Sequence, residues 1–243
     1  MGDGTQVVNI GTSNLPVSIN KAESDTAQLS EMATQSYQKS LNLSQSSAKS
    51  IGDSYRQLVS LSDNLAKSES LNDGITQGIS AEQSSAIHQA SQLIQRFADS
   101  NNISTDKASQ ILGSVTAGTP DFWIKASLSG QASISASDQQ LLQKAEEFTK
   151  NEDFQQLTRE ATQASKNISH TLSDESSKRM AEDVSGSYET GMQQREDAQK
   201  SYQEAESYNQ QASNTKANAS SINAIHNQQF VEWLAEQPAD NAR

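Results

Sequence analysis

The chain has 243 residues, of which only 33% are hydrophobic and 5% aromatic, and its formal net charge is −12. An ordinary globular domain is ~45–50% apolar when glycine is counted, so a large compact core is excluded. The negative charge disfavours nucleic acid and anionic membrane surfaces as partners. The absence of cysteine excludes disulfides and thiol catalysis, and no run of ~18 apolar residues could span a bilayer.

Residues 1–20 are predicted to form an extended N-terminal arm. Their apolar residues alternate only weakly, and Pro16 disfavours a helix or a central strand. The segment lacks the positively charged start and apolar stretch of a signal peptide. Its abrupt start at Met1 suggests a piece of a longer protein.

Residues 21–70 are predicted to form the first long helix of a stalk. Apolar and small residues recur in steps of four, and then in alternating steps of three and four. They are Leu29, Ala33, Tyr37, Leu41, Ser44, Ala48, Ile51, Tyr55, Leu58, Ser62 and Leu65. This is a heptad seam in which small residues occupy about half of the positions. At 1.5 Å per residue, 50 helical residues span roughly 75 Å.

Residues 71–165 are predicted to form a small inserted α+β head. Gly74 and Gly78 interrupt the helical pattern, and Ser80 with Gln83 forms a capping-box sequence before a strongly amphipathic helix. A short helix beginning after Ser104 should end near Gly113. Residues 123–136 alternate in polarity and predict a β-hairpin. A helix then begins at Ser137 or Asp138, and either continues past Asn151 or restarts there.

Residues 166–243 are predicted to form the second stalk helix, from about Thr171 to Glu236, and a tail. The seam repeats in steps of four and three from Met180 to His226. At ~1.5 Å per residue the helix approaches 100 Å. A helix this polar is marginal by itself, and the first helix is the nearest partner. The expected fold is therefore mainly α: an elongated, coiled-coil-like antiparallel helical hairpin with an inserted head.

The sequence offers little catalytic chemistry. His88, His170 and His226 are scattered and are interpreted as solvated helix residues. No G-x-S-x-G elbow, dinucleotide fingerprint or phosphate loop occurs. Paired carboxylates such as Glu146–Glu147 lie near predicted helix ends, where they favour the macrodipole or face water. We therefore expect no enzymatic activity, no metal site and no cofactor.

One polar–aromatic group stands out, at residues 120–123. In a chain poor in aromatic residues, Phe122 and Trp123 are adjacent. They are either core residues of the head or an exposed binding patch, because tryptophan is favoured at binding hot spots. Phe122 and Trp123 are thus the candidate partner-binding residues.

Two segments together resemble the C-terminal region of the TraG family, the mating-pair stabilisation proteins of F-type conjugative plasmids. The first runs from "LSQSSAKSIGDSY" to "QLIQRFA" (43–98), and the second from "SDESSKRMAEDVS" to "NQQFVEWL" (173–234). The resemblance rests on overall pattern and composition and covers most of the chain.

The resemblance implies a periplasmic region of an inner-membrane protein of a type IV secretion system in a Gram-negative bacterium. It implies roles in mating-pair stabilisation and entry exclusion, through other conjugation proteins and TraS of the recipient inner membrane. It supplies no catalytic residues. Two alternatives remain: a structural coiled-coil module of another secretion or phage tail system, and an enzyme of unfamiliar fold in the head.

Overall fold

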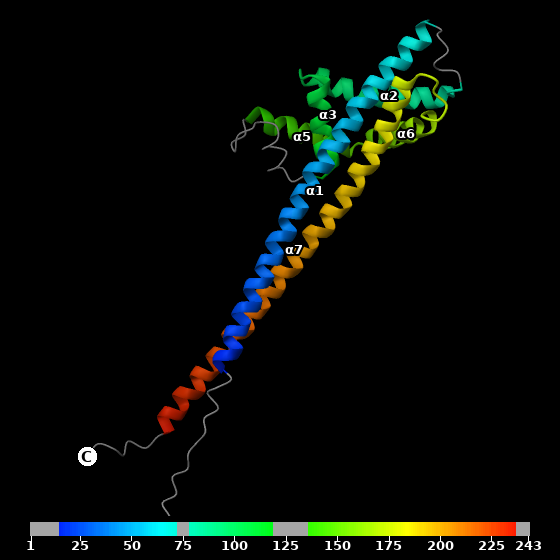
Figure 1. Ribbon diagram of the computed structural model, residues 1–243. Coiled ribbons are helices and arrows are strands. Elements are labelled where there is room, and N and C mark those ends of the chain that lie inside the picture. Colours follow the sequence, from blue (N-terminus) through cyan, green and yellow to red (C-terminus); the bar gives the residue numbers. More distant parts are fainter. Residues whose placement is uncertain (1–14, 72–77, 119–135, 237–243) are drawn as a thin grey trace, which may run out of the picture. The chain divides into compact units, whose positions relative to one another are not determined.

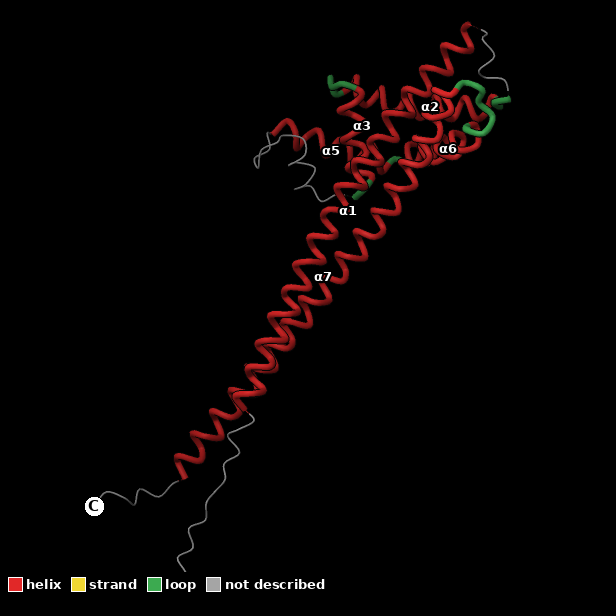
Figure 2. The backbone as a smooth tube through the Cα atoms, viewed as in Figure 1, coloured by secondary structure: helices red, strands yellow, loops and turns green. Residues whose placement is uncertain are grey.

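In the computed structural model, residues 15–71, 78–118 and 136–236 are described, and the elements among them are all helices (Figure 1). They are α1 (Leu15–Leu71), α2 (Ala81–Ser100), α3 (Thr105–Thr116), α5 (Ala136–Lys150), α6 (Glu152–Ile168) and α7 (Glu175–Glu236). Figure 2 shows only helix and loop in this part of the chain. The mainly α class is therefore confirmed.

The predicted α+β character of the head is not observed in the described part of the chain. Residues 119–135, which hold nearly all of the predicted β-hairpin at 123–136, lie outside the described residues. The last residue of that hairpin, Ala136, is the first residue of α5. Alternation of apolar with small residues does not distinguish a strand from a helix at this position, because Ala and Ser are compatible with both.

The prediction of an extended arm over residues 1–20 is wrong from Leu15 onward, where α1 has already begun. Residues 1–14 lie outside the described residues. Pro16 was interpreted as a helix breaker, but in the first turn of a helix its missing N–H would have no intrahelical partner anyway. The proline is therefore compatible with the start of α1.

Helices α2, α3 and α6 each begin with a polar side chain that accepts a backbone N–H. The capping box predicted at Ser80 is confirmed. The Ser80 hydroxyl accepts the Gln83 N–H, and the Gln83 side chain accepts the Ser80 N–H. Ser104 caps α3 and Asn151 caps α6, so a new helix does restart after Asn151. Helix α3 continues three residues past Gly113, because that glycine lies inside the helix.

The sequence predicted that the second stalk helix begins at about Thr171. Helix α7 begins instead at Glu175, because Asp174 caps it. The Asp174 carboxylate accepts the Ser177 N–H at 2.7 Å, and its carbonyl accepts the Lys178 N–H at 2.9 Å. Hydrogen bonding from the Ser177 backbone lowers the pKa of Asp174 below its ordinary value of 3.8. A carboxylate also favours the positive end of the helix dipole.

We expect Asp174→Ala to lower the free energy of unfolding by about 1 kcal/mol near neutral pH, the usual cost of losing an N-cap. Since the folded pKa is lowered, the cap stabilises above the ordinary pKa and loses its effect as pH falls through the folded pKa. Urea unfolding at neutral and acid pH checks this. Asp174→Asn is the control, because it keeps the acceptor without the charge. An equal loss for Ala at both pH values would contradict the assignment.

The chain divides into two units, one of residues 1–39 and 201–243 and the other of residues 40–200. In the second unit, three buried serines on α1 donate hydrogen bonds to backbone carbonyl oxygens of α7. They are Ser40 to Ala198 at 2.8 Å, Ser47 to Gly191 at 2.7 Å and Ser54 to Val184 at 2.7 Å. Each step of seven forward on α1 matches seven backward on α7, so the two helices are antiparallel there.

Close helix contacts in this unit depend on glycine. A Cβ added at Gly113 of α3 would lie 2.4 Å from the backbone nitrogen of Gly52 in α1, and one at Gly191 of α7 would lie 2.5 Å from Cγ1 of Ile51. The core around these contacts includes Tyr55, Phe97 and other apolar residues of α1, α2, α3, α5, α6 and α7. Helices α2, α3, α5 and α6 therefore form a small helical domain together with the adjoining parts of α1 and α7 (Figure 1).

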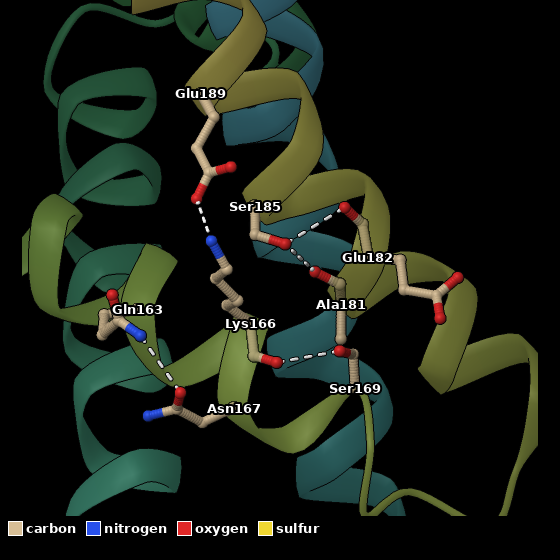
Figure 3. Close-up of polar contacts among 8 residues, drawn as sticks. All are labelled: Gln163, Lys166, Asn167, Ser169, Ala181, Glu182, Ser185 and Glu189. Atoms are coloured by element: carbon tan, nitrogen blue, oxygen red, sulfur yellow. Dashed lines mark hydrogen bonds and ion pairs between the residues drawn. The ribbon is translucent and has the colours of Figure 1, made fainter.

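Helix α6 is also connected to α7 by polar contacts (Figure 3). The Lys166 ammonium group lies 2.7 Å from the Glu189 carboxylate, with both side chains about half exposed. Such an ion pair contributes roughly 0–1 kcal/mol. The hydroxyl of the buried Ser185 donates to carbonyl oxygens of its own helix, at Ala181 and Glu182. The ion pair therefore marks, and does not determine, the face of α6 that is turned toward α7.

In the unit formed by residues 1–39 and 201–243, the described residues belong to α1 and α7. Ala33, Ala205 and Ala212 are buried. The Tyr37 hydroxyl donates to the Glu206 carboxylate, and the rings of Tyr37 and Tyr202 meet edge to face with centroids 5.5 Å apart. The small-residue seam predicted from the sequence is thus present in this unit too.

Candidate functional site

A cavity of about 460 Å³ lies in the unit formed by residues 40–200, where five helices meet. Its lining comprises Tyr55 of α1, Val115 and Thr116 of α3, Thr149 and Lys150 of α5, Phe154, Gln155, Thr158 and Arg159 of α6, and Tyr188, Met192 and Arg195 of α7. A volume of this order is within the range of small-ligand sites. Aromatic, aliphatic and basic side chains meet in this cavity.

The inner wall of the cavity is aromatic. The rings of Tyr55 and Phe154 are nearly fully buried and meet edge to face, with centroids 5.8 Å apart. Phe148 packs against Phe154 with centroids 5.2 Å apart. The Tyr55 hydroxyl lies 3.1 Å from Oγ1 of Thr116, so the buried phenol has a hydrogen-bond partner. This wall is rigid and apolar.

The two tyrosines of the cavity have perturbed acidities. Burial raises the pKa of Tyr55 well above its ordinary value of 10.0. Burial also raises the pKa of Tyr188, and the nearby guanidinium groups of Arg159 and Arg195 partly oppose that rise. Both phenols are therefore neutral hydrogen-bonding groups at physiological pH rather than bases.

We expect the folded chain to lose stability as pH rises above 10, the ordinary tyrosine value. A raised folded pKa means that the stabilisation is fully present below the unfolded pKa and is lost as pH rises through the folded pKa. Tyr55→Phe should cost about 1 kcal/mol near neutral pH through the lost hydrogen bond, and should reduce the alkaline loss. Urea unfolding at both pH values checks this. An unchanged alkaline loss in Tyr55→Phe would contradict it.

Basic side chains surround the outer part of the cavity. Arg159 donates to the carbonyl oxygen of Gln155 at 3.2 Å and to its side-chain oxygen at 3.4 Å. Nε of Arg195 lies near the C-terminal end of α3, 3.7 Å from where a Cβ of Gly118 would be, and the negative end of the helix dipole favours a cation there. Lys150 has a distant partner, Glu146, at 3.8 Å.

None of the candidate residues singled out from the sequence is among the described residues that line this cavity. Phe122 and Trp123 lie outside the described residues, and the side chain of His226 is also not described. His170 is exposed, as predicted. His88 is not a solvated residue: it is half buried, and its Nδ1 lies 2.7 Å from the hydroxyl of Ser62, which is itself buried. No carboxylate bonds to His88 in the described part of the chain, so this pair gives no triad.

The sequence contained no local signal for the cavity. Tyr55 lies in the seam predicted for residues 21–70, but the two arginines belong to no motif. Arg159 and Arg195 come from different helices, 36 positions apart in the chain. They line one cavity only because α6 and α7 pack together.

Comparisons of the chain with models of known protein families, with curated proteins and with solved structures found no match. Among the described residues, no helix has a stretch that is long and apolar enough to cross a bilayer. The class that fold and site define is a mainly α protein with a helical domain and a cavity whose lining mixes aromatic and basic residues.

Proposed function

We propose that this chain is a non-enzymatic periplasmic interaction domain of a conjugation protein similar to TraG. In this proposal it stabilises the mating pair and acts in entry exclusion by contacting a protein of the recipient cell, with TraS as the first candidate. The proposal takes the overall form to be an elongated antiparallel hairpin, with the domain of α2, α3, α5 and α6 as its recognition head. It rests on the sequence resemblance and on the helical architecture.

The observation that carries the proposal is the contrast between two parts of the chain. The described helices of the unit formed by residues 1–39 and 201–243 bury a seam of small residues and expose mainly polar side chains, apart from the apolar Met32, Tyr202 and Ile225. Such a repetitive surface discriminates poorly between partners. The unit formed by residues 40–200 has a mixed aromatic and aliphatic core and a shaped cavity. Distinct shape on a rigid scaffold is what specific recognition requires.

A conjugation assay tests the proposal. The chain, joined to the membrane part of a TraG protein, replaces the matching region in a donor strain, with and without residues 81–168. We expect mating and exclusion with the intact chain and the loss of at least one without the head. Failure of the intact chain in both assays would overturn the proposal and favour a structural module of another secretion or phage tail system. Circular dichroism of the deleted form controls for folding of the remaining helices.

Phe122 and Trp123 are the proposed contact residues of the head. We expect the double substitution to Ala to weaken exclusion or mating without changing the thermal melt. A lowered melt would instead make both residues core. Full activity with an unchanged melt would remove them from recognition.

The elongated form is tested by solution scattering of the isolated chain. We expect a longest dimension near ~100 Å, set by the second long helix. A radius of gyration near ~18 Å, the value for 243 packed residues, would contradict the hairpin.

A further inference from the structure

The charge of the cavity is opposite to that of the chain. The chain has 30 acidic and 18 basic residues. The described residues that line the cavity nevertheless include three basic side chains, Lys150, Arg159 and Arg195, and no carboxylate. A concave site with walls of low dielectric strengthens the field of the charges that line it. The cavity is therefore a local anion-attracting site on an anionic protein.

The two arginines have unused binding capacity. A guanidinium group carries five N–H donors in a fork that matches a carboxylate. In the described part of the chain, no carboxylate lies within ion-pair distance of Arg159 or Arg195, and Arg159 bonds only to Gln155. Arg195 is partly buried, which limits its screening by water, whereas Arg159 is exposed. Both arginines line the cavity, and both guanidinium groups are close enough to Tyr188 to lower its pKa.

The remaining lining defines the rest of the ligand. Phe154 and Tyr55 form an apolar wall, and Val115 and Met192 add aliphatic surface. Thr158 is 2% exposed, and its hydroxyl already donates to the carbonyl oxygen of Phe154 at 2.8 Å. Tyr55, Phe154 and Thr158 are already packed, so the apolar lining open to a ligand is Val115, Tyr188 and Met192, which are partly exposed. The site thus suits an apolar group placed against these three residues and flanked by negative charge at the arginines.

We propose that this cavity binds an acidic segment of a protein partner, with an apolar side chain against Val115 and Met192 and flanking carboxylates on Arg159 and Arg195. The inference rests on the proposed function in one respect, that the occupant is a segment of a protein. A small anion alone would leave the partly exposed Val115, Tyr188 and Met192 uncovered, which favours a peptide over inorganic phosphate.

The test is an NMR titration of the isotope-labelled full chain with the peptide acetyl-Asp-Glu-Leu-Glu-Asp-amide. The neutral analogue with Asn and Gln, and inorganic phosphate, are titrated in parallel. We expect the acidic peptide to shift the amide signals of cavity residues such as Val115 and Met192, and added salt to weaken binding. Equal shifts with the neutral analogue, shifts elsewhere, or binding of phosphate but not of the peptide would each overturn the inference.

Matched variants locate the binding. We expect Arg159→Gln together with Arg195→Gln to lower the affinity for the acidic peptide by at least about tenfold, since each removes charge-assisted hydrogen bonds. Arg179→Gln is the control, because it removes an exposed arginine of the same helix α7 that does not line the cavity. Replacement of both cavity arginines by Lys keeps the charge and should give an intermediate loss. Equal affinities for the double Gln variant and the Arg179 control would overturn the inference.

The two proposals fail in different ways. The titration uses only the purified chain, whereas the conjugation assay measures mating and exclusion in cells. Peptide binding through the two arginines with no role in conjugation would remove the proposed function and keep the site. Restored conjugation with no peptide binding would keep the proposed function and remove the peptide site.

Discussion

Replacing Gly113 with Ala should lower the free energy of unfolding by about 1–3 kcal/mol, the usual cost of overpacking a tight contact. The new Cβ would lie 2.4 Å from the nitrogen and 2.6 Å from the Cα of Gly52, and 3.0 Å from the carbonyl oxygen of Ala48. All three are backbone atoms of α1, so no side chain can rotate away. Helices α1 and α3 must move apart, and the core residues between them lose contacts.

Gly186→Ala is the matched control. Gly186 also lies within a helix, α7, but an added Cβ would meet nothing within 4 Å. Alanine at an exposed helical glycine usually stabilises by about 0.5–1 kcal/mol, because glycine loses more backbone entropy on folding. Urea unfolding followed by circular dichroism measures both variants. A stability gain in both would mean that α1 and α3 do not approach as closely as the structure has them.

Gly191→Ala should have an intermediate effect. Its Cβ would lie 2.5 Å from Cγ1 of Ile51, a side-chain atom, but also 3.1 Å from the nitrogen of Ile51 and 3.2 Å from the carbonyl oxygen of Ser47. The Ile51 side chain can yield in part, whereas the backbone cannot. The hydrogen bond from Ser47 to the Gly191 carbonyl oxygen would also be disturbed.

The helices were predictable because their signals are local and periodic. Seam positions on α7 such as Val184, Ala198 and Ala205 are buried, as the steps of four and three predicted. The caps at Ser80 and Ser104 were visible because an N-cap needs only a polar side chain and a free N–H. The start of α1 was missed because proline was interpreted without its position in the first turn.

The serine contacts and the cavity could not be predicted in the same way. Ser40, Ser47 and Ser54 are spaced by seven, yet serine is as common on the solvated faces of this chain as in its seams. Their hydroxyls are buried and donate to carbonyl oxygens only because α7 lies close to α1, which Gly191 permits. The cavity depends on five helices and therefore on tertiary packing alone.

The largest loss of stability is expected from Phe154→Ala, at about 3–5 kcal/mol, the range for removing a buried aromatic ring. Phe154 is 2% exposed and packs against both Tyr55 and Phe148, so its removal leaves α1, α5 and α6 around an enlarged cavity. Phe154→Leu is the control, since it retains much of the apolar volume and should cost less. Urea unfolding of the two variants gives the comparison. A loss below about 1 kcal/mol for Ala would show that Phe154 is not part of the core.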